Sequence, residues 1–375
     1  MSESSIKNCK KTSLVNNLLS ADLYELQLPF QQAFSHSKKS RKSSDSFMLR
    51  LVDDKGNEGW GEALPRDYVT GEDARSLKKD FAEIAWPALP DIPPQVQGSL
   101  RCLVSTALLD LELQASNQHF AERYPKRRDI FSSGVIGSGS RESIIKIAKF
   151  YCDLQLPSVK LKVSCLDDLD LLPILRKILG DKCLLRLDAN AAFDFETALE
   201  FMRQAAAFGV DLIEQPLAVG DEEAAAELRR AGPMRIIADE SLTNLKQAEN
   251  LIKLGACDIF NLRLSKCGGV EPLIEIAKLG RKNGLGLMMG CHVGESALLS
   301  AMGSQLAQHL GVSLFEGCFG SYLLAQDICQ KDLRFGSSGK IPSFKSESSF
   351  GIDLEAAQII KLSADHLHFS TQDSL

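Results

Sequence analysis

A repeat with a period near 26 residues constrains the fold of this chain more than any other feature of its sequence. From Lys162 to Cys291, the residues that close successive apolar runs follow one another at intervals of 25 to 27 residues. The runs occupy residues 132–137, 158–164, 183–190, 211–216, 235–241, 258–265, 284–290 and 313–317. Helical patterns separate them, such as residues 167–180 and 195–209, each with glycine at its end. This alternation predicts parallel strands with crossover helices, and eight such strands close into an α/β barrel.

The main competing architecture is an open, doubly wound parallel sheet. That fold usually binds a cofactor through a glycine-rich turn after its first strand. The corresponding stretch here, GVIGSGSRES at residues 134–143, matches that pattern poorly. The barrel is therefore the better prediction.

Residues before about 125 follow a different pattern. Strand-like runs occupy residues 22–30, 46–54 and 58–64, and helical patterns follow near residues 72–86 and 98–117. This predicts a separate α+β domain. The polar segment 34–46 has the composition of a loop, and two interpretations remain open for it: a disordered connection, or a mobile lid over the mouth of the barrel.

Composition excludes several classes of function. The formal net charge of -6 gives no electrostatic support for a general role in nucleic-acid binding. No apolar run approaches the ~20 residues of a membrane span, and the polar N-terminus lacks the apolar core of an export signal. The 10 cysteines show no CxxC or metal-finger spacing, which is typical of reduced cysteines in a cytosolic protein. We therefore expect a cytoplasmic protein that binds neither nucleic acid nor membrane.

Carboxylates follow three consecutive predicted strands. Asp188 ends one strand, with Asn190 on the same face; Glu214 ends the next; Asp239 and Glu240 end the third. Each alone is typical of a helix cap, but strand ends in a barrel converge on one site. Three anions can share such a site if a cation lies between them, and oxygen ligands favour Mg²⁺, with Mn²⁺ as a substitute.

Lysines flank these carboxylates on both sides. In the run SVKLKVS, Lys160 and Lys162 alternate with aliphatic residues, so the two lysines share one face of their strand. Lys266 follows the strand on the other side of the carboxylates. A carboxylate substrate bound to a divalent cation has an acidified α-carbon, and a neutral lysine on either side can remove its proton to give an enediolate.

Five motifs at this order and spacing resemble those of the enolase superfamily, in its muconate-lactonizing-enzyme subgroup. They are KLK (160–162), DAN (188–190), EQP (214–216), ADES (238–241) and SKCGG (265–269). The resemblance implies a (β/α)7β TIM-like barrel with an N-terminal α+β capping domain that the C-terminal segment completes. We place the boundaries at residues 1–17 for a flexible tail, 18–125 for the cap, 126–335 for the barrel and 336–375 for the returning segment.

The resemblance also implies roles for individual residues. The metal ligands would be Asp188, Glu214 and Asp239. The acid and base would be Lys162 and Lys266, with Lys160 tuning Lys162. Glu240 would support Lys266 from behind the ligands.

The segments that would determine the substrate match the family pattern less well than the five motifs do. GEALPRDYVTGE, at residues 61–72, is similar to the cap loop of dipeptide epimerases. Those enzymes carry a DxD pair after the last strand, whereas FEGCFGSYLL at 315–324 offers only Glu316, and its FG step is closer to the cycloisomerases. His292 is either an ordinary loop residue or a contact to the substrate at the barrel mouth.

These observations predict a Mg²⁺-dependent racemase or epimerase that acts on the α-carbon of a small carboxylate, an amino-acid or dipeptide derivative. The alternatives are a muconate-type cycloisomerase or an o-succinylbenzoate-synthase-like dehydratase on the same scaffold, and, more remotely, a non-catalytic binding module. We expect a homo-oligomer.

Overall fold

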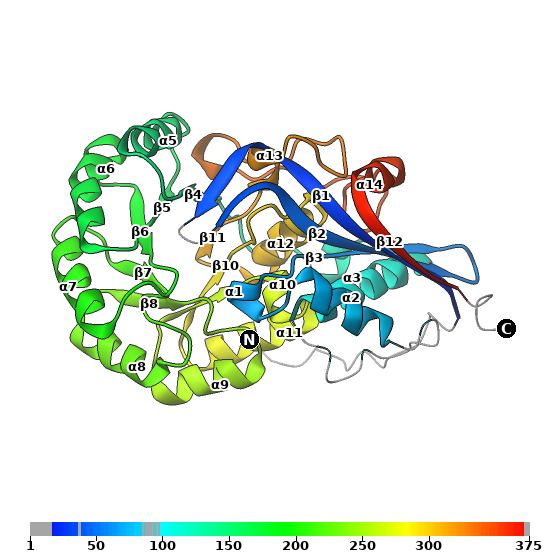
Figure 1. Ribbon diagram of the computed structural model, residues 1–375, viewed down its shortest axis with the longest axis horizontal. Coiled ribbons are helices and arrows are strands. Elements are labelled where there is room, and N and C mark those ends of the chain that lie inside the picture. The colour runs from blue at the N-terminus through cyan, green and yellow to red at the C-terminus, as the bar shows by residue number, and fades with distance from the viewer. Residues whose placement is uncertain are drawn as a thin grey trace.

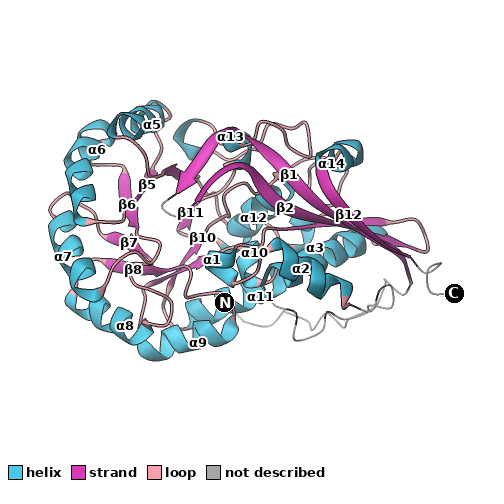
Figure 2. Ribbon diagram, viewed as in Figure 1, coloured by secondary structure: helices cyan, strands magenta, loops and turns pink. Residues whose placement is uncertain are grey.

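The computed structural model describes residues 17–36, 39–84, 86, 92, 96 and 98–370. It contains an eight-stranded sheet and a four-stranded sheet. In Figures 1 and 2 the helices α5 to α9 form an arc outside the strands of the larger sheet, and the smaller sheet lies on the other side of the molecule. This arrangement is that of an α/β barrel with a capping domain.

The larger sheet is parallel, and its strands follow one another in chain order from β11 back to β4. Its strands are β4 (Gly134–Ile136), β5 (Ser158–Lys162), β6 (Leu184–Asp188), β7 (Leu212–Glu214), β8 (Arg235–Ala238), β9 (Ile259–Leu262), β10 (Gly286–Met289) and β11 (Leu314–Phe315). Ser132, just before β4, forms a parallel bridge with Phe315 of β11, and Ser133 N donates to Phe315 O at 2.9 Å. These contacts close the ring, and every strand lies within a run that the repeat predicts.

Helices connect the barrel strands. They are α5 (Arg141–Asp153), the 3₁₀ turn η1 (Leu166–Leu171) with α6 (Leu172–Leu179), α7 (Phe195–Ala206), α8 (Glu222–Ala231), α9 (Leu245–Leu254), α10 (Leu264–Cys267) with α11 (Val270–Lys282), and α12 (Ala297–Leu310). The helix expected over 167–180 is thus divided. Pro173 lies in the first turn of α6, and a continuous helix would bring its ring against the carbonyl of residue 169.

The faces of the barrel strands differ in character. On β5, Val159 and Leu161 join the large apolar core, while the alternate positions face inward. Part of the interior is filled by a small separate cluster of Leu212, Ile237, Ile259 and Met288. Closer to the strand ends the inward residues become charged, which builds the site described below.

The antiparallel capping sheet has the order β12-β1-β2-β3. Its strands are β1 (Leu18–His36), β2 (Lys39–Asp53), β3 (Glu58–Ala63) and β12 (Ser363–Ser370). Helix α3 (Gly98–Ala115) lies against β3 so closely that a Cβ on Gly61 would approach Leu103 O to 2.2 Å. Helix α2 (Ala74–Ala82) precedes α3.

Short elements complete the chain. They are α1 (Asp67–Thr70), α4 (Phe120–Arg123), α13 (Gly320–Leu323), η2 (Ser337–Gly339) and α14 (Ala356–Leu362). Among the described residues, no helix combines the length and apolarity that crossing a membrane requires.

The prediction of a loop over residues 34–46 is wrong for the part that the structure describes. Strands β1 and β2 continue through it, with Phe34 paired to Arg41 and His36 to Lys39; residues 37 and 38 lie outside the described residues. Backbone hydrogen bonds hold a hairpin regardless of side-chain polarity, so a polar composition did not exclude strands here. Nearer its base the hairpin contacts the barrel domain, because Phe30 bridges Leu324 just after α13.

A buried carboxylate joins the cap to the barrel. Glu62 on β3 accepts hydrogen bonds from Ser296 N at 2.9 Å, Leu299 N at 3.0 Å and the Ser296 hydroxyl at 2.6 Å. These donors belong to the N-terminus of α12, where backbone N–H groups lack partners within the helix. The contact fixes the loop that links β10 to α12 against the cap.

Candidate active site

The predicted site residues converge where the barrel strands end. Asp188 and Glu214 are the last residues of β6 and β7, and Asp239 directly follows β8; all three are at most 1% exposed. The sheet order places these strands between β5, which carries Lys160 and Lys162, and β9, which leads into Lys266 on α10. The structure therefore brings the carboxylates together, with lysines on both sides.

Lys160 lies at the centre of a buried ion-pair network. Its Nζ is 2.9 Å from Asp188 Oδ2, 3.5 Å from Glu214 Oε2 and 2.9 Å from Glu316 Oε1. Arg186 pairs with the same two glutamates, with Nη1 2.7 Å from Glu214 Oε2 and Nη2 against Glu316 Oε2. Burial alone would raise the pKa of Glu316, but Lys160 and Arg186 hold it at about 2. Glu316 thus serves these two cations in this structure.

A second pair of cations holds Asp239. The Arg263 guanidinium contacts Asp239 Oδ2 and lies 3.7 Å from Glu214 Oε1. Lys266 Nζ donates to Asp239 Oδ1 at 2.8 Å, to Asp239 O at 2.7 Å and to Asn261 O at 2.8 Å. Burial acts in the opposite direction, but Arg263 and Lys266 lower the pKa of Asp239 below its usual range.

Lys162 occupies a more open position than Lys266. It is half-buried, and its Nζ donates to Asn190 Oδ1 at 2.7 Å. Asn190 has a φ of 41°, a left-handed conformation that asparagine tolerates, and its Nδ2 donates to Glu240 Oε1 at 3.1 Å. Burial, with the neighbouring charges of Asp239 and Asp188, raises the pKa of Glu240 to about 8. A hydrogen-bond chain thus links Glu240 to Lys162 across the strand ends, whereas the resemblance implied a position near Lys266 for this residue.

His292 lies in the loop between β10 and α12 and is 3% exposed. Neither ring nitrogen has a hydrogen-bond partner among the described residues. Burial, together with the charges of Arg263 and Arg66, keeps the pKa of His292 well below its usual range, so the imidazole is neutral. Its backbone N donates to Glu295 Oε1 at 2.6 Å, and Arg66 Nη2 from the 61–72 segment donates to the neighbouring Val293 O at 3.2 Å. The cap therefore holds this loop in place.

Comparison with known proteins assigns the barrel to a family. Residues 146–338 match the family model described as "Enolase C-terminal domain-like". The chain belongs to this family. The match contains both flanking lysines and all three carboxylates, and it confirms the predicted resemblance to the enolase superfamily.

Relatives of this enolase-like chain are isomerases. The N-succinyl-L-Arg/Lys racemase of Bacillus cereus is 26% identical over 306 residues, which is 76% of this chain and 82% of the racemase. Muconate cycloisomerase 1 of Acinetobacter baylyi is 28% identical over 315 residues, 77% of this chain and 84% of that enzyme. The solved dipeptide epimerase of Cytophaga hutchinsonii, complexed with Mg and D-Ala-L-Val, superposes with a TM-score of 0.84 at 20% identity, covering 94% of this chain and 99% of that one. These relatives confirm the prediction of an isomerase.

Three buried polar residues of the enolase-like barrel were not predicted from the sequence. Arg186 and Arg263 pair with the carboxylates, and Asn261 Nδ2 donates to Glu214 Oε1 at 2.8 Å. Strand alternation could have indicated that Arg186 points into the barrel, because it lies two residues before Asp188 and therefore on the same face. Arginine is rarely buried, however, so an arginine in a strand is usually interpreted as exposed.

The composition of the site suits a hard divalent cation. The candidate ligands are all carboxylate oxygens, and two further buried oxygens, Asn261 Oδ1 and Glu240 Oε2, lack hydrogen-bond partners among the described residues. Each of the three carboxylates nevertheless pairs with a basic side chain in this structure. Within the described residues, the one group whose three candidate ligand atoms all lie within 4.8 Å of one another is elsewhere, at Asp22, His366 and His368. Binding of Mg²⁺ would require Arg263 and Lys266 to yield part of their contacts with Asp239.

Proposed function

We propose that this protein is a Mg²⁺-dependent racemase or epimerase that exchanges the α-proton of a carboxylate substrate. The observation that carries this proposal is the strand order β9-β8-β7-β6-β5, which sets three carboxylates between two lysines. A base on each side of the substrate plane suits inversion of a stereocentre, since one lysine removes the proton and the other returns it.

The two lysines are prepared for different tasks. Lys266 Nζ donates to three acceptors, which is the full donor set of an ammonium group. In this state it can give a proton to the substrate, and it must first lose a proton, with one of these contacts, before it can act as the base for the other enantiomer. Lys162 Nζ is half-buried and bonds to Asn190, so it can turn toward a substrate at small cost.

The proposed metal ligands are Asp188, Glu214 and Asp239, with Mn²⁺ as a substitute for Mg²⁺. When bound, the ion would supply Lewis-acid stabilisation of the negative charge that develops as the α-proton leaves, so that an enediolate can form. Arg186 and Lys160 hold Glu214 in orientation, and Glu240 supports the Lys162–Asn190 pair from behind.

The proposed substrate is an amino-acid or dipeptide derivative. The names of the racemase and epimerase relatives support this class. Glu316 already pairs with Lys160 and Arg186, so it is poorly placed to bind a free substrate ammonium. An N-acylated amino acid, whose amide carries no charge, fits this arrangement better. The neutral imidazole of His292, with two unpartnered nitrogens, would meet a polar group of the substrate.

Three structural details belong to the same proposal. Seven strand–helix units followed by β11 support the (β/α)7β description of the barrel. The proposed domains are a cap over residues 18–125 and a barrel over residues 126–335. The pairing of β12 with β1 supports the proposal that residues 336–375 return to the cap and complete it. Assembly as a homo-oligomer is a further expectation.

Incubation of a library of dipeptides and N-acylamino acids with the Mg²⁺-loaded protein in D₂O tests the function. Uptake of one α-deuterium, read by mass spectrometry, identifies the substrates, and chiral chromatography then detects inversion. If no carboxylate in the library exchanges its α-proton, the proposal fails for these substrate classes.

A muconate-type cycloisomerase is the second candidate. The step Phe319–Gly320 after the last strand and the matching cycloisomerase of Acinetobacter baylyi favour it. A cycloisomerase or a dehydratase needs only one lysine as base. Formation of a lactone, or loss of water, without inversion would identify this chemistry.

A further inference from the structure

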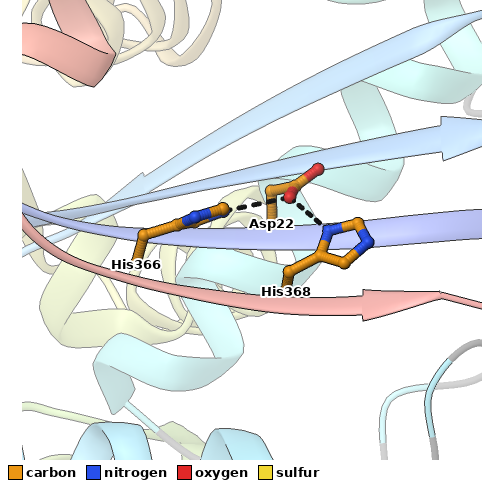
Figure 3. Close-up of side chains that lie close together, drawn as sticks. All are labelled: Asp22, His366 and His368. Atoms are coloured by element: carbon orange, nitrogen blue, oxygen red, sulfur yellow. Dashed lines mark hydrogen bonds and ion pairs between the residues drawn. The ribbon is translucent and has the colours of Figure 1, made fainter. Parts of the chain in front are cut away.

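A second cluster of potential ligands lies on the capping sheet, outside the barrel. Figure 3 shows His366 and His368 on β12 turned toward Asp22 on the neighbouring strand β1. His366 Nε2 is 3.0 Å from Asp22 Oδ1, and His368 Nδ1 is 2.6 Å from the same oxygen. The three candidate ligand atoms all lie within 4.8 Å of one another.

The strand register explains how residues so far apart in sequence meet. Asp22 pairs with His368, and Tyr24 pairs with His366. Residues two apart on a strand share a face, so both imidazoles stand on the same side of β12 as Asp22 does of β1. Tyr24 stacks on the His366 ring with a centroid separation of 4.6 Å and an interplanar angle of 6°. This stacking restricts His366 to the orientation that faces Asp22.

We propose that Asp22, His366 and His368 bind a divalent transition-metal ion, with Zn²⁺ the best match. Two imidazole nitrogens and one carboxylate oxygen form a ligand set that suits Zn²⁺, and such sites leave a fourth position for water. Mg²⁺ prefers oxygen ligands alone, so it would not compete here. The histidine side chains are 43% and 49% exposed, which gives an ion access from solvent, while Asp22 is 8% exposed.

The surrounding charge permits a cation. Arg50 on β2 lies opposite Asp22 and would by itself disfavour a positive ion. Its guanidinium, however, pairs with Glu58, with Arg50 Nε 3.0 Å from Glu58 Oε2. Asp365, the residue before His366 on β12, carries a negative charge that Lys78 balances at 3.0 Å. The positive charges near the cluster are therefore paired with carboxylates.

The bound ion would act as a clamp between β12 and β1. Strand β12 is at the edge of the sheet and approaches the end of the chain (Figure 1), so β1 is its one partner strand in the described sheet. An ion that ligates both strands would hold the edge strand in place. Because β1 also reaches the barrel domain through Phe30, the clamp would stabilise the cap that covers the barrel.

Titration of the full-length protein with ZnCl₂, followed by calorimetry, tests this site. To exclude the barrel ligands, the titration uses the Asp188→Asn variant in excess MgCl₂. We expect one equivalent of Zn²⁺ to bind, and we expect His366→Gln/His368→Gln in the same background to lose that equivalent. Asp22→Asn should weaken binding at least tenfold. Matched controls are His119→Ala and His309→Ala, whose imidazoles contact backbone carbonyls elsewhere and should retain the equivalent.

A second readout locates the ion. Trp60 stacks with Tyr24 at 6.2 Å, so Cu²⁺ bound at the cluster should quench Trp60 emission in a Trp86→Phe background. The His366→Gln/His368→Gln variant should lose this quenching, while circular dichroism without metal confirms that it is folded. The proposal is overturned if the parent binds no Zn²⁺, or if the double variant binds it with unchanged stoichiometry and affinity.

Discussion

Glu316 at the barrel mouth and Asp110 in the capping domain are both buried carboxyl groups, but their pKa values are shifted in opposite directions. In the barrel, Lys160 and Arg186 hold the pKa of Glu316 at about 2 against the effect of burial. In the cap, burial raises the pKa of Asp110 to about 7, although the hydrogen bonds from the Ser349 hydroxyl and from the Trp60 backbone N–H, at 2.7 Å, act in the opposite direction. Buried charge is therefore maintained at neutral pH only where basic partners surround it.

This difference distinguishes the candidate active site of the barrel from a structural hydrogen bond in the cap. Around the barrel carboxylates, basic side chains already supply positive charge, so an incoming cation replaces existing partners. Among the described residues, Asp110 in the cap has only neutral donors, so an incoming cation would find no basic partner to replace there.

Substitution of the flanking lysines should have the largest effect and should act in the barrel alone. Lys162→Ala should abolish α-proton exchange with one substrate enantiomer, and Lys266→Ala with the other, while net racemisation disappears in both. Loss of a general base costs on the order of 10²–10⁴ in rate, which deuterium uptake followed by mass spectrometry resolves.

The exposed Lys182, near the start of β6, provides the matched control, and Lys182→Ala should exchange both enantiomers like the parent. A different outcome would favour the cycloisomerase. In that case one lysine variant would lose exchange with both enantiomers, and the other would retain it with both.

Removal of a carboxylate should weaken Mg²⁺ binding when the carboxylate belongs to the barrel site and leave it unchanged when the carboxylate belongs to the cap. Asp188→Asn, Glu214→Gln and Asp239→Asn should each weaken Mg²⁺ binding at least tenfold in calorimetry, because each amide removes ligand charge at nearly constant volume. Asp110→Asn removes an equally buried carboxyl from the cap and should leave Mg²⁺ affinity unchanged. Parent-like Mg²⁺ binding by all three barrel variants would show that the ligand assignment is wrong.

The barrel was predictable because its pattern repeats. Strand after strand places aliphatic residues toward the helices and polar residues at the carboxyl end, as with Asp188 and Glu214. A polar residue in an otherwise apolar run is conspicuous, and its position at a strand end indicates where it converges with others. The sequence thus predicted the eight strands and the neighbourhood of the carboxylates and lysines.

The remaining features depend on contacts that sequence spacing does not display. The extended hairpin over 34–46 rests on backbone pairing between polar residues. Arg186 and Arg263 are buried only because partners from other strands neutralise them. His366 and Asp22 are 344 residues apart, and only the register of β12 against β1 brings them together.

The opposite pKa shifts predict different pH dependences of stability. The folded-state pKa of Asp110 is about 7, above the ~3.9 of an unfolded aspartate, so the folded protein binds more protons between these values. Its contribution to the free energy of unfolding is present below pH ~4 and is lost as the pH rises through 7. At ~1.4 kcal/mol per pKa unit, the loss amounts to a few kcal/mol.

Urea denaturation at pH 5.0, 6.0 and 7.5 measures this contribution as the free energy of unfolding of the parent minus that of Asp110→Asn. This difference should decrease as the pH rises. Glu316→Gln is the matched barrel variant. The pKa of Glu316 is about 2, so its contribution is lost only as the pH falls from ~4.3 toward 2, and its difference from the parent should stay flat over this range. A flat difference for Asp110→Asn would mean that its carboxyl is ionised in the folded protein.

The smallest effect concerns the histidine cluster of the cap and catalysis. His366→Gln/His368→Gln should exchange α-protons at a rate within about twofold of the parent, because these side chains belong to β12 and contact Asp22 and Tyr24 rather than the barrel carboxylates. The same variant should lose the rise in melting temperature that Zn²⁺ gives the parent, since an ion that binds only the folded state stabilises it. Deuterium uptake and thermal unfolding, measured with and without ZnCl₂ on one preparation, report both effects. If the double variant instead lost exchange as strongly as Lys162→Ala does, the cap cluster would have to act on the barrel site, and the division between a reactive barrel and a structural cap would fail.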